Sequence, residues 1–278
     1  MRKKYIVILC ISLAVLILCG AAVIKHAADS RRAARQYEEL AGEIVSPADP
    51  EPSGYSPQTV PETVPADPSG PEAPDGEQKA DDAQAAPYVS PVDFDALWEI
   101  NPDVIGWITV PGTDIDFPIL MSADDNGYYL THDIYGEEII SASIFIENYN
   151  SPDFSDFNTV VYGHNMNDGN MFGQLHRFED PDFFAENRTF TVYLPDREFS
   201  CRIFSARFVG DEHILSVCRN GDRESCEEYI AGIFGDSSGD ANTDRSGLVT
   251  ADDRIVTLST CDRYNASRRY VVHGVVMP

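Results

Sequence analysis

Hydrophobic and polar positions divide the 278-residue chain into an apolar start, a polar middle stretch and a long patterned remainder. Residues 5–24 carry no charge and follow a basic tail at residues 1–4. A run of about 20 apolar residues matches the hydrocarbon thickness of a bilayer. The pattern predicts a single transmembrane anchor at 5–24, a cytoplasmic tail at 1–4, a juxtamembrane helix at 25–45 and the bulk of the chain outside.

Two other interpretations of this apolar run stay open. Gly20, Ala21 and Ala22 could form the cleavage site of a signal peptide, although the apolar part of a signal peptide usually spans about 7–15 residues. Lipid attachment at Cys19 would favour a small residue before it, and the chain has Leu18 there. Basic residues flank the run on both sides, so the charge rule for orientation is nearly balanced.

Residues 46–91 differ in composition from both neighbours. They hold 11 of the 18 prolines, together with many acidic and small residues and almost no large apolar ones. Such a stretch cannot bury enough apolar surface to offset the entropy of folding. It is predicted to be a disordered, partly polyproline linker that spans about 40 Å if flexible. The linker is either a tether that extends the reach of the following domain or a mere spacer.

The remaining residues, 92–278, alternate between short β-rich runs and turn signals, which predicts one mainly β domain. Helical spacing over 93–100, 171–178 and 225–234 is the exception, and 236–247 is predicted to be loop. Many short strands with few helices suggest a closed or nearly closed β-barrel, which leaves no exposed sheet edge. The expected strands cover 104–110, 115–120, 143–146, 159–162, 189–194, 199–209, 254–259 and 268–276.

Charge and cysteine content exclude several function classes. Acidic residues outnumber basic ones 46 to 20, and the formal net charge of −26 argues against nucleic-acid binding. The cysteines form no CxxC pair, so a zinc site and a dense disulfide framework are both disfavoured. Cys201 alternates with apolar neighbours and is interpreted as a core residue. We expect no metal and no cofactor.

Three residues could together perform thiol acyl transfer. Cys261 ends the β-branched run 255–261, His164 follows an apolar strand and Gly163 into a polar loop, and Arg269 opens the next strand. A strand end at the rim of a barrel is a rigid place to present a reactive group. Each residue alone has an ordinary interpretation: a packed cysteine, a surface histidine and a solvated arginine. Together they supply a nucleophile, a proton carrier and an oxyanion donor.

These motifs resemble those of the sortases. Tyr-Gly-His-Asn at 162–165, Thr-Leu-Ser-Thr-Cys at 257–261 and Arg-Tyr-Val-Val at 269–272 are similar to the His, Cys and Arg motifs of that family in order and spacing. The stretch 93–108 and the helix-containing insertion at about 211–252 resemble class B members. The resemblance implies an eight-stranded β-barrel with an N-terminal helix and a helix in the insertion before the Cys strand.

The resemblance also implies a reaction outside a Gram-positive cell. Cys261 attacks the Thr carbonyl of a C-terminal sorting signal on a secreted protein, and a thioester forms. His164 protonates the leaving amine, Arg269 stabilises the oxyanion, and a cell-wall precursor amine resolves the thioester. The sorting motif and the acceptor, whether a wall precursor or a pilin lysine, stay undetermined.

Two departures from the class B pattern bear on the site. Only eight positions separate Cys261 from Arg269, which leaves Arg268 as a rival donor because adjacent strand residues face opposite sides. Asp262 follows the cysteine where class B members often carry Glu. The residues predicted to line a substrate groove are Tyr162, Asn126, Leu130, Ser259 and Thr260.

Two rival functions are kept. An L,D-transpeptidase of the cell wall also uses Cys, His and Arg, but its His and Cys normally share a compact motif, whereas 97 positions separate His164 from Cys261 here. A catalytically idle, tethered binding module is the other rival, and the presence of all three polar groups argues against it. A papain-like protease is disfavoured because its Cys precedes its His.

Overall fold

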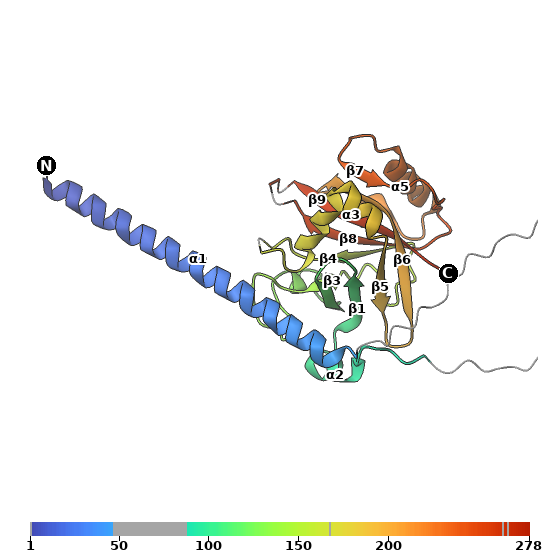
Figure 1. The fold of residues 1–278 in the computed structure, drawn as a ribbon, viewed down its shortest axis with the longest axis horizontal. Helices are drawn as coiled ribbons and strands as arrows, with labels where there is room; N and C mark the ends of the chain where they lie inside the picture. The colour runs from blue at the N-terminus through green and yellow to red at the C-terminus, as the bar shows by residue number, and fades with distance from the viewer. Residues whose placement is uncertain (1, 47–87, 167, 263, 266) are drawn as a thin grey trace, which may run out of the picture.

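A closed β-barrel forms the body of the protein in a computed structural model (Figure 1). The structure describes residues 2–46, 88–166, 168–262, 264–265 and 267–278, without the side chains of residues 2–12, 14, 22 and 26. The strand order is β5-β1-β2-β3-β4-β8-β9-β6, and β6 pairs with β5 to close the ring. The eight-stranded barrel expected from the motifs is confirmed, and a short strand, β7, is added on β6.

The strand bounds follow the sequence pattern closely. Pairing is antiparallel except between β2 and β3 and between β4 and β8, which run parallel. The strands are β1 (Val104–Val110), β2 (Ile115–Leu120), β3 (Ile144–Ile146), β4 (Asn158–Tyr162), β5 (Thr189–Tyr193), β6 (Glu198–Gly210), β7 (Ala241–Thr243), β8 (Ile255–Cys261) and β9 (Arg268–Val276).

Alternate residues of β8 and β9 face two different cores, and this alternation positions the site. Leu258, Tyr270 and Val272 belong to the main core inside the barrel. Val271, one position away from both Tyr270 and Val272, packs outside the barrel against Ile214 of the insertion. The insertion before β8 therefore covers part of the outer face and leaves the end of β8 open.

The helices include three short ones that the sequence pattern did not indicate. The predicted helix over 171–178 is a 3-10 helix, and the predicted loop over 236–247 contains β7. The short helices η1, α3 and α4 were not anticipated, because three to six residues give too few repeats for a period to be recognised. The bounds are α1 (Arg2–Ile44), α2 (Phe94–Ile100), η1 (Tyr128–Leu130), η2 (Phe172–Glu179), α3 (Pro181–Glu186), α4 (Ile214–Val217) and α5 (Arg223–Gly235).

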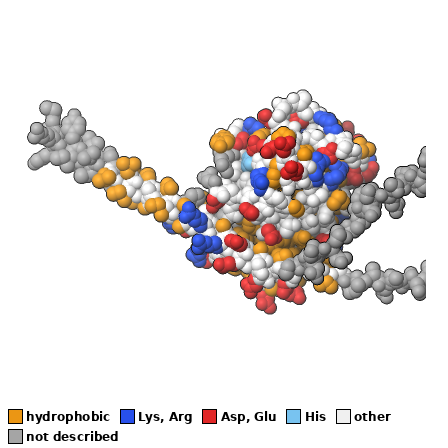
Figure 2. All heavy atoms as spheres, viewed as in Figure 1, with side chains coloured by type: hydrophobic (Ala, Val, Ile, Leu, Met, Phe, Trp, Pro, Cys, Tyr) orange, Lys and Arg blue, Asp and Glu red, His pale blue; other side chains and the backbone are white. Residues whose placement is uncertain are grey.

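The C-terminal part of α1 packs against the barrel, while its N-terminal part extends away from it (Figure 1). Tyr37, Leu40 and Ile44 are buried in the main core. The Tyr37 hydroxyl donates to the Ala142 carbonyl at 3.2 Å, and its ring meets Phe117 edge-on. Figure 2 shows basic side chains gathered on α1 where it reaches the barrel, beside acidic side chains of the barrel surface.

Within the described part of the chain, no helix is both long and apolar enough to cross a bilayer. Part of the predicted anchor at 5–24 lies outside the described side chains, namely those of residues 5–12, 14 and 22. The anchor therefore stays a prediction.

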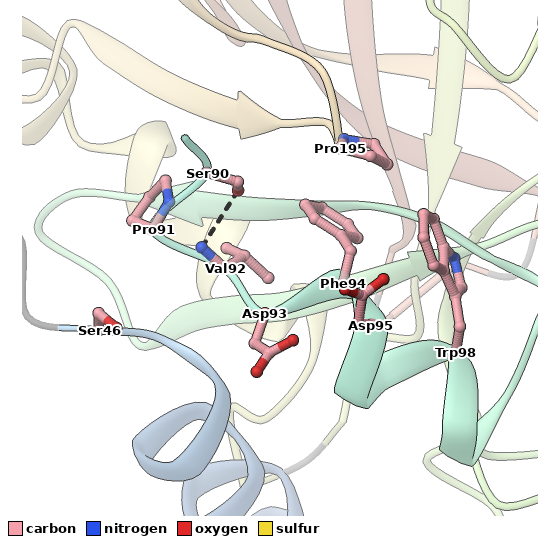
Figure 3. Close-up of a pocket in the computed structure, with 9 residues that line it drawn as sticks. All are labelled: Ser46, Ser90, Pro91, Val92, Asp93, Phe94, Asp95, Trp98 and Pro195. Atoms are coloured by element: carbon pink, nitrogen blue, oxygen red, sulfur yellow. Dashed lines mark hydrogen bonds between the residues drawn. The ribbon is translucent and has the colours of Figure 1, made fainter. Parts of the chain in front are cut away.

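The two described ends of the predicted linker lie side by side. The Ser46 N–H donates to the Pro91 carbonyl at 2.9 Å, and Val45 pairs with Val92 in an isolated antiparallel bridge. Figure 3 shows this junction, where Ser46 at the end of α1 faces the segment that leads into α2. Residues 47–87, on which the prediction of disorder falls, lie outside the described residues.

Candidate active site

Cys261 is the last residue of β8 and is exposed at the outer face of the barrel. Its side chain is on the opposite face of the strand from Thr260, whose hydroxyl donates to the Gly163 carbonyl at 2.8 Å inside the structure. Among the described cysteines of residues 88–278, the other three are buried: Cys201, Cys218 and Cys226. Burial raises the pKa of the Cys201 thiol, and it raises that of Cys218 to about 12, so these thiols stay protonated. Cys261 is the accessible thiol of the barrel.

Arg269 lies directly opposite Cys261 in the antiparallel β8–β9 ladder. Directly opposed residues share a face, so both side chains point to the same side of the sheet. Arg268 points to the other side, where its guanidinium lies 4.0 Å from the centroid of the Phe208 ring and 3.6 Å from Asp262. The ladder thus separates the two arginines that the sequence left as rivals.

His164 follows β4 through Gly163, and the glycine is required by packing. A Cβ at position 163 would overlap the side chains of Ile144 and Phe172. The His164 Nε2 atom lies 2.8 Å from the Leu130 carbonyl of η1. This contact fixes the imidazole plane with Nε2–H as the donor, which leaves Nδ1 as the acceptor of the neutral ring.

One pocket brings the three residues together. It has a volume of about 190 Å³ and lies where the ends of β4, β8 and β9 meet the loop that contains η1. Its lining residues are Leu130, Phe145, Glu147, Tyr162, Gly163, His164, His213, Ser259, Thr260, Cys261 and Arg269. A concave site with a thiol, an imidazole and a guanidinium fits the requirements of acyl transfer.

Four of the five predicted groove residues line this pocket: Tyr162, Leu130, Ser259 and Thr260. Asn126 does not line the pocket; its side-chain oxygen accepts a 2.6 Å hydrogen bond from the Asn148 N–H. Burial raises the pKa of the Tyr162 phenol, and the neighbouring Glu147 carboxylate raises it further. Tyr162 therefore stays neutral at the pocket wall.

Sequence reasoning missed three lining residues: Phe145, Glu147 and His213. The His213 Nε2 atom lies 2.6 Å from Glu147 Oε2, which joins the insertion to the end of β3 beside the pocket. Phe145 stacks on Tyr162 across the β3–β4 pair at 5.5 Å between centroids. Their pairing depends on strands and loops far apart along the chain, so no local pattern could have found them.

Within the described residues, no group of three or more His, Cys, Asp or Glu side chains could hold a metal ion. His273 on β9 is buried away from this pocket; burial lowers its pKa to about 3, and its Nε2 lies 3.0 Å from the Tyr229 hydroxyl.

Residues 108–277 match a family described as "Sortase domain". Sortase B of Listeria monocytogenes is 36% identical over 166 residues, which cover 60% of this chain and 65% of that protein. Sortase B of Staphylococcus aureus is 30% identical over 183 residues, covering 64% of this chain and 72% of the relative. The solved structure of Clostridium perfringens sortase B aligns with a TM-score of 0.60 at 32% identity, over 66% of this chain and 100% of that one.

Proposed function

Because the chain belongs to the sortase family, we propose that it is a class B cysteine transpeptidase of a Gram-positive cell surface. It cleaves a C-terminal sorting signal after Thr and transfers the protein to a cell-wall amine. The observation that carries the proposal is the shared pocket of Cys261, His164 and Arg269. The class B assignment is supported by the likeness to three sortase B proteins and by the helical insertion before β8.

The first half of the reaction forms a thioester. The Cys261 thiolate attacks the Thr carbonyl carbon, and the carbonyl oxygen becomes an oxyanion beside the Arg269 guanidinium. A fixed, permanently charged donor on the same face as the sulfur suits this charge. As the tetrahedral intermediate collapses, the C–N bond breaks and His164 donates a proton to the leaving amine.

The second half reverses these roles. An acceptor amine attacks the thioester carbonyl, His164 accepts the proton that the amine loses, and the C–S bond breaks to regenerate the Cys261 thiolate. The surface protein leaves joined by an amide bond, so the two halves balance without an external cofactor. The acceptor is a cell-wall precursor amine in this proposal, and a pilin lysine is the alternative.

The proposal that the reaction takes place at the membrane surface is based on the apolar run at 5–24. We propose that it anchors the enzyme in the membrane as a single span, with the barrel outside. The docking of Tyr37, Leu40 and Ile44 on the barrel supports a fixed distance between the anchor and the pocket. Secreted proteins that still carry their sorting signals are then presented near the same membrane surface.

Intact mass spectrometry tests the function directly. The full chain in detergent is incubated with a panel of sorting-signal peptides, with and without a small amine acceptor. We expect a thioester adduct on Cys261 that disappears when the amine is added, and no adduct for Cys261→Ala. Cleavage that survives in the Ala variant, or an adduct on another residue, would overturn the assignment.

A further inference from the structure

The backbone carbonyl of Cys261 lies beyond the end of the regular strand pairing. The Asp262 N–H donates to the Arg268 carbonyl, so Cys261 and Arg269 form a non-hydrogen-bonded pair whose own carbonyls point away from each other. The Cys261 carbonyl therefore faces the β4 side, as the Ser259 carbonyl does when it accepts from the Gly163 N–H. Because β4 ends at Tyr162, no strand residue is left to bond to it.

Two side chains replace the missing strand partner. Asn165 Nδ2 lies 2.9 Å from the Cys261 carbonyl oxygen, and His176 Nε2 lies 3.1 Å from the same atom. Asn165 Nδ2 also lies 2.9 Å from His176 Nε2. The carbonyl of the nucleophile is thus held by the loop that contains His164 and by the 3-10 helix η2.

His176 is itself fixed on two sides. Its Nδ1 atom lies 2.5 Å from Glu179 Oε1 at the end of η2, and its ring stacks on Tyr270 at 4.9 Å with an interplanar angle of 23°. The carboxylate requires a proton on Nδ1. In the imidazolium form, His176 Nε2–H donates to the Cys261 carbonyl. In the neutral form, Nε2 accepts from Asn165 Nδ2, which also donates to that carbonyl. His176 is therefore linked to the Cys261 carbonyl in both forms, either directly or through Asn165.

We propose that His176, oriented by Glu179, is a positioning residue for Cys261. It restrains the backbone of the last β8 residue, so that the thiol keeps its place beside His164 and Arg269. The role of this pair rests on the proposed function, because the reacting atom that it positions is the Cys261 sulfur. His176 does not line the catalytic pocket and has no contact with substrate in this proposal.

Two variants separate this positioning from a general role in stability. In His176→Gln, the side-chain amide nitrogen replaces Nε2 and can donate to the Cys261 carbonyl. In His176→Asn, the amide is one bond shorter and cannot reach the carbonyl. Both variants lose the ring that stacks on Tyr270, so they share any loss of packing. The full chain in detergent is assayed for kcat and KM with a sorting-signal peptide that the wild type cleaves.

We expect His176→Asn to lose at least about tenfold in kcat with KM unchanged, and His176→Gln to stay within about threefold of wild type. Equal activity in the two variants, whether both are normal or both are impaired, would overturn the proposal. A loss confined to KM would do the same. Melting temperatures of the two variants should agree with each other.

A second readout does not depend on peptide cleavage. The rate at which iodoacetamide alkylates Cys261 is followed by mass spectrometry of the peptide that carries this residue. We expect the rate to change in His176→Asn and not in His176→Gln. If no peptide is cleaved even by wild type, the proposed function fails, and the alkylation rates still decide the positioning role: equal rates in all three proteins would reject it.

Discussion

Cys261 and Arg269 are directly opposed across the β8–β9 ladder as a non-hydrogen-bonded pair. In such pairs the Cα atoms are about 4.5 Å apart and the side chains are closer than in the alternate pairs. The guanidinium therefore stays on the same face as the sulfur, whatever the conformation of the loop between the strands. The neighbouring Arg268 is also on β9, but its side chain points to the opposite face, where its guanidinium lies over the Phe208 ring.

Replacing Arg269 with alanine is expected to remove an oxyanion donor. The loss of one such donor costs about 2.7–4 kcal/mol, or about 10²–10³ in kcat. We expect Arg269→Ala to lose at least about 2 kcal/mol of transition-state stabilisation, and Arg269→Lys to restore only part of it because a lysine lacks the planar fork. Single-turnover formation of the thioester adduct is the measurement.

Arg268→Ala is the matched control, since it removes the same charge from the adjacent position. Its ion pair with Asp262 and its ring contact contribute to local stability, but they are outside the pocket. Acylation within about threefold of wild type is expected. A dead Arg268→Ala beside an active Arg269→Ala would transfer the oxyanion role to Arg268.

Leu130 offers a test of the groove. Leu130 is 48% exposed and lines the pocket, and its contact with His164 is made by the backbone carbonyl. Leu130→Ala should therefore weaken peptide binding and leave the acid/base group in place. We expect KM to rise about fivefold to thirtyfold, equivalent to about 1–2 kcal/mol of lost apolar contact, with kcat unchanged.

Asn126→Ala is the control for that prediction, because Asn126 was expected in the groove and lies outside the pocket lining. Its peptide KM should match wild type within about twofold. A fall in kcat for Leu130→Ala would show that the side chain, and not only the carbonyl, holds His164.

The strands of the barrel were readable from local patterns. The runs Val104–Val110, Ile115–Leu120 and Arg268–Val276 end in the structure at the residues where the pattern changes. Gly112 marks the first hairpin because its φ of +79° is open to glycine, and a Cβ there would overlap Asn187. β7 was missed because its three residues, Ala241–Thr243, have no apolar alternation and pair only through β6.

The three residues proposed to carry the chemistry could be identified from local sequence features, and they line one pocket, but the residues that support them could not be identified. Cys261 ends β8, Arg269 lies at the start of β9 and His164 follows the end of β4 by two residues, and each of these is a local feature. By contrast, His176 reaches the Cys261 carbonyl from 85 positions away, and Glu147 reaches His213 across 66 positions. Such contacts are fixed by barrel closure and by the packing of η2, and no window of sequence contains both partners.

The buried His273 predicts a specific loss of stability in acid. The unfolded chain takes up a proton at this histidine below pH about 6.5, whereas burial lowers the folded-state pKa to about 3. The stability that His273 contributes is therefore present above pH about 6.5 and is lost as the pH falls toward 3. Between pH 7 and pH 5 the free energy of unfolding should fall by about 2 kcal/mol through this group.

Denaturant unfolding of the full chain at several pH values, followed by tryptophan fluorescence, gives the measurement. His273→Gln removes the titrating group and keeps an amide near the Tyr229 hydroxyl. The difference in unfolding free energy between the two proteins should shrink as the pH falls from 7 to 5. Parallel pH profiles would mean that the pKa of His273 is the same in the folded and unfolded states, and would contradict the prediction.

The junction at Ser46 and Pro91 makes a prediction about the segment between them. Their hydrogen bond and the Val45–Val92 bridge bring the chain back to the end of α1 after residues 47–87. The chain between residues 46 and 91 is therefore a loop whose two ends are held together by these contacts. Each doubling of the length of a flexible loop costs about 0.6 kcal/mol in closure entropy. Replacing the 41 residues 47–87 with six Gly and Ser residues shortens the loop by nearly three halvings and is expected to stabilise the protein by about 1.5 kcal/mol.

Thermal melting of the full chain in detergent measures this effect. A replacement of unchanged length, made only of Gly and Ser, is the matched control and should melt with the wild type. If 47–87 instead acted as a tether that lets the barrel move away from α1, the short loop would strain the connection. The short variant would then melt below the long one. The buried side chains of Tyr37, Leu40 and Ile44 favour the first outcome, since a barrel that left α1 would expose all three.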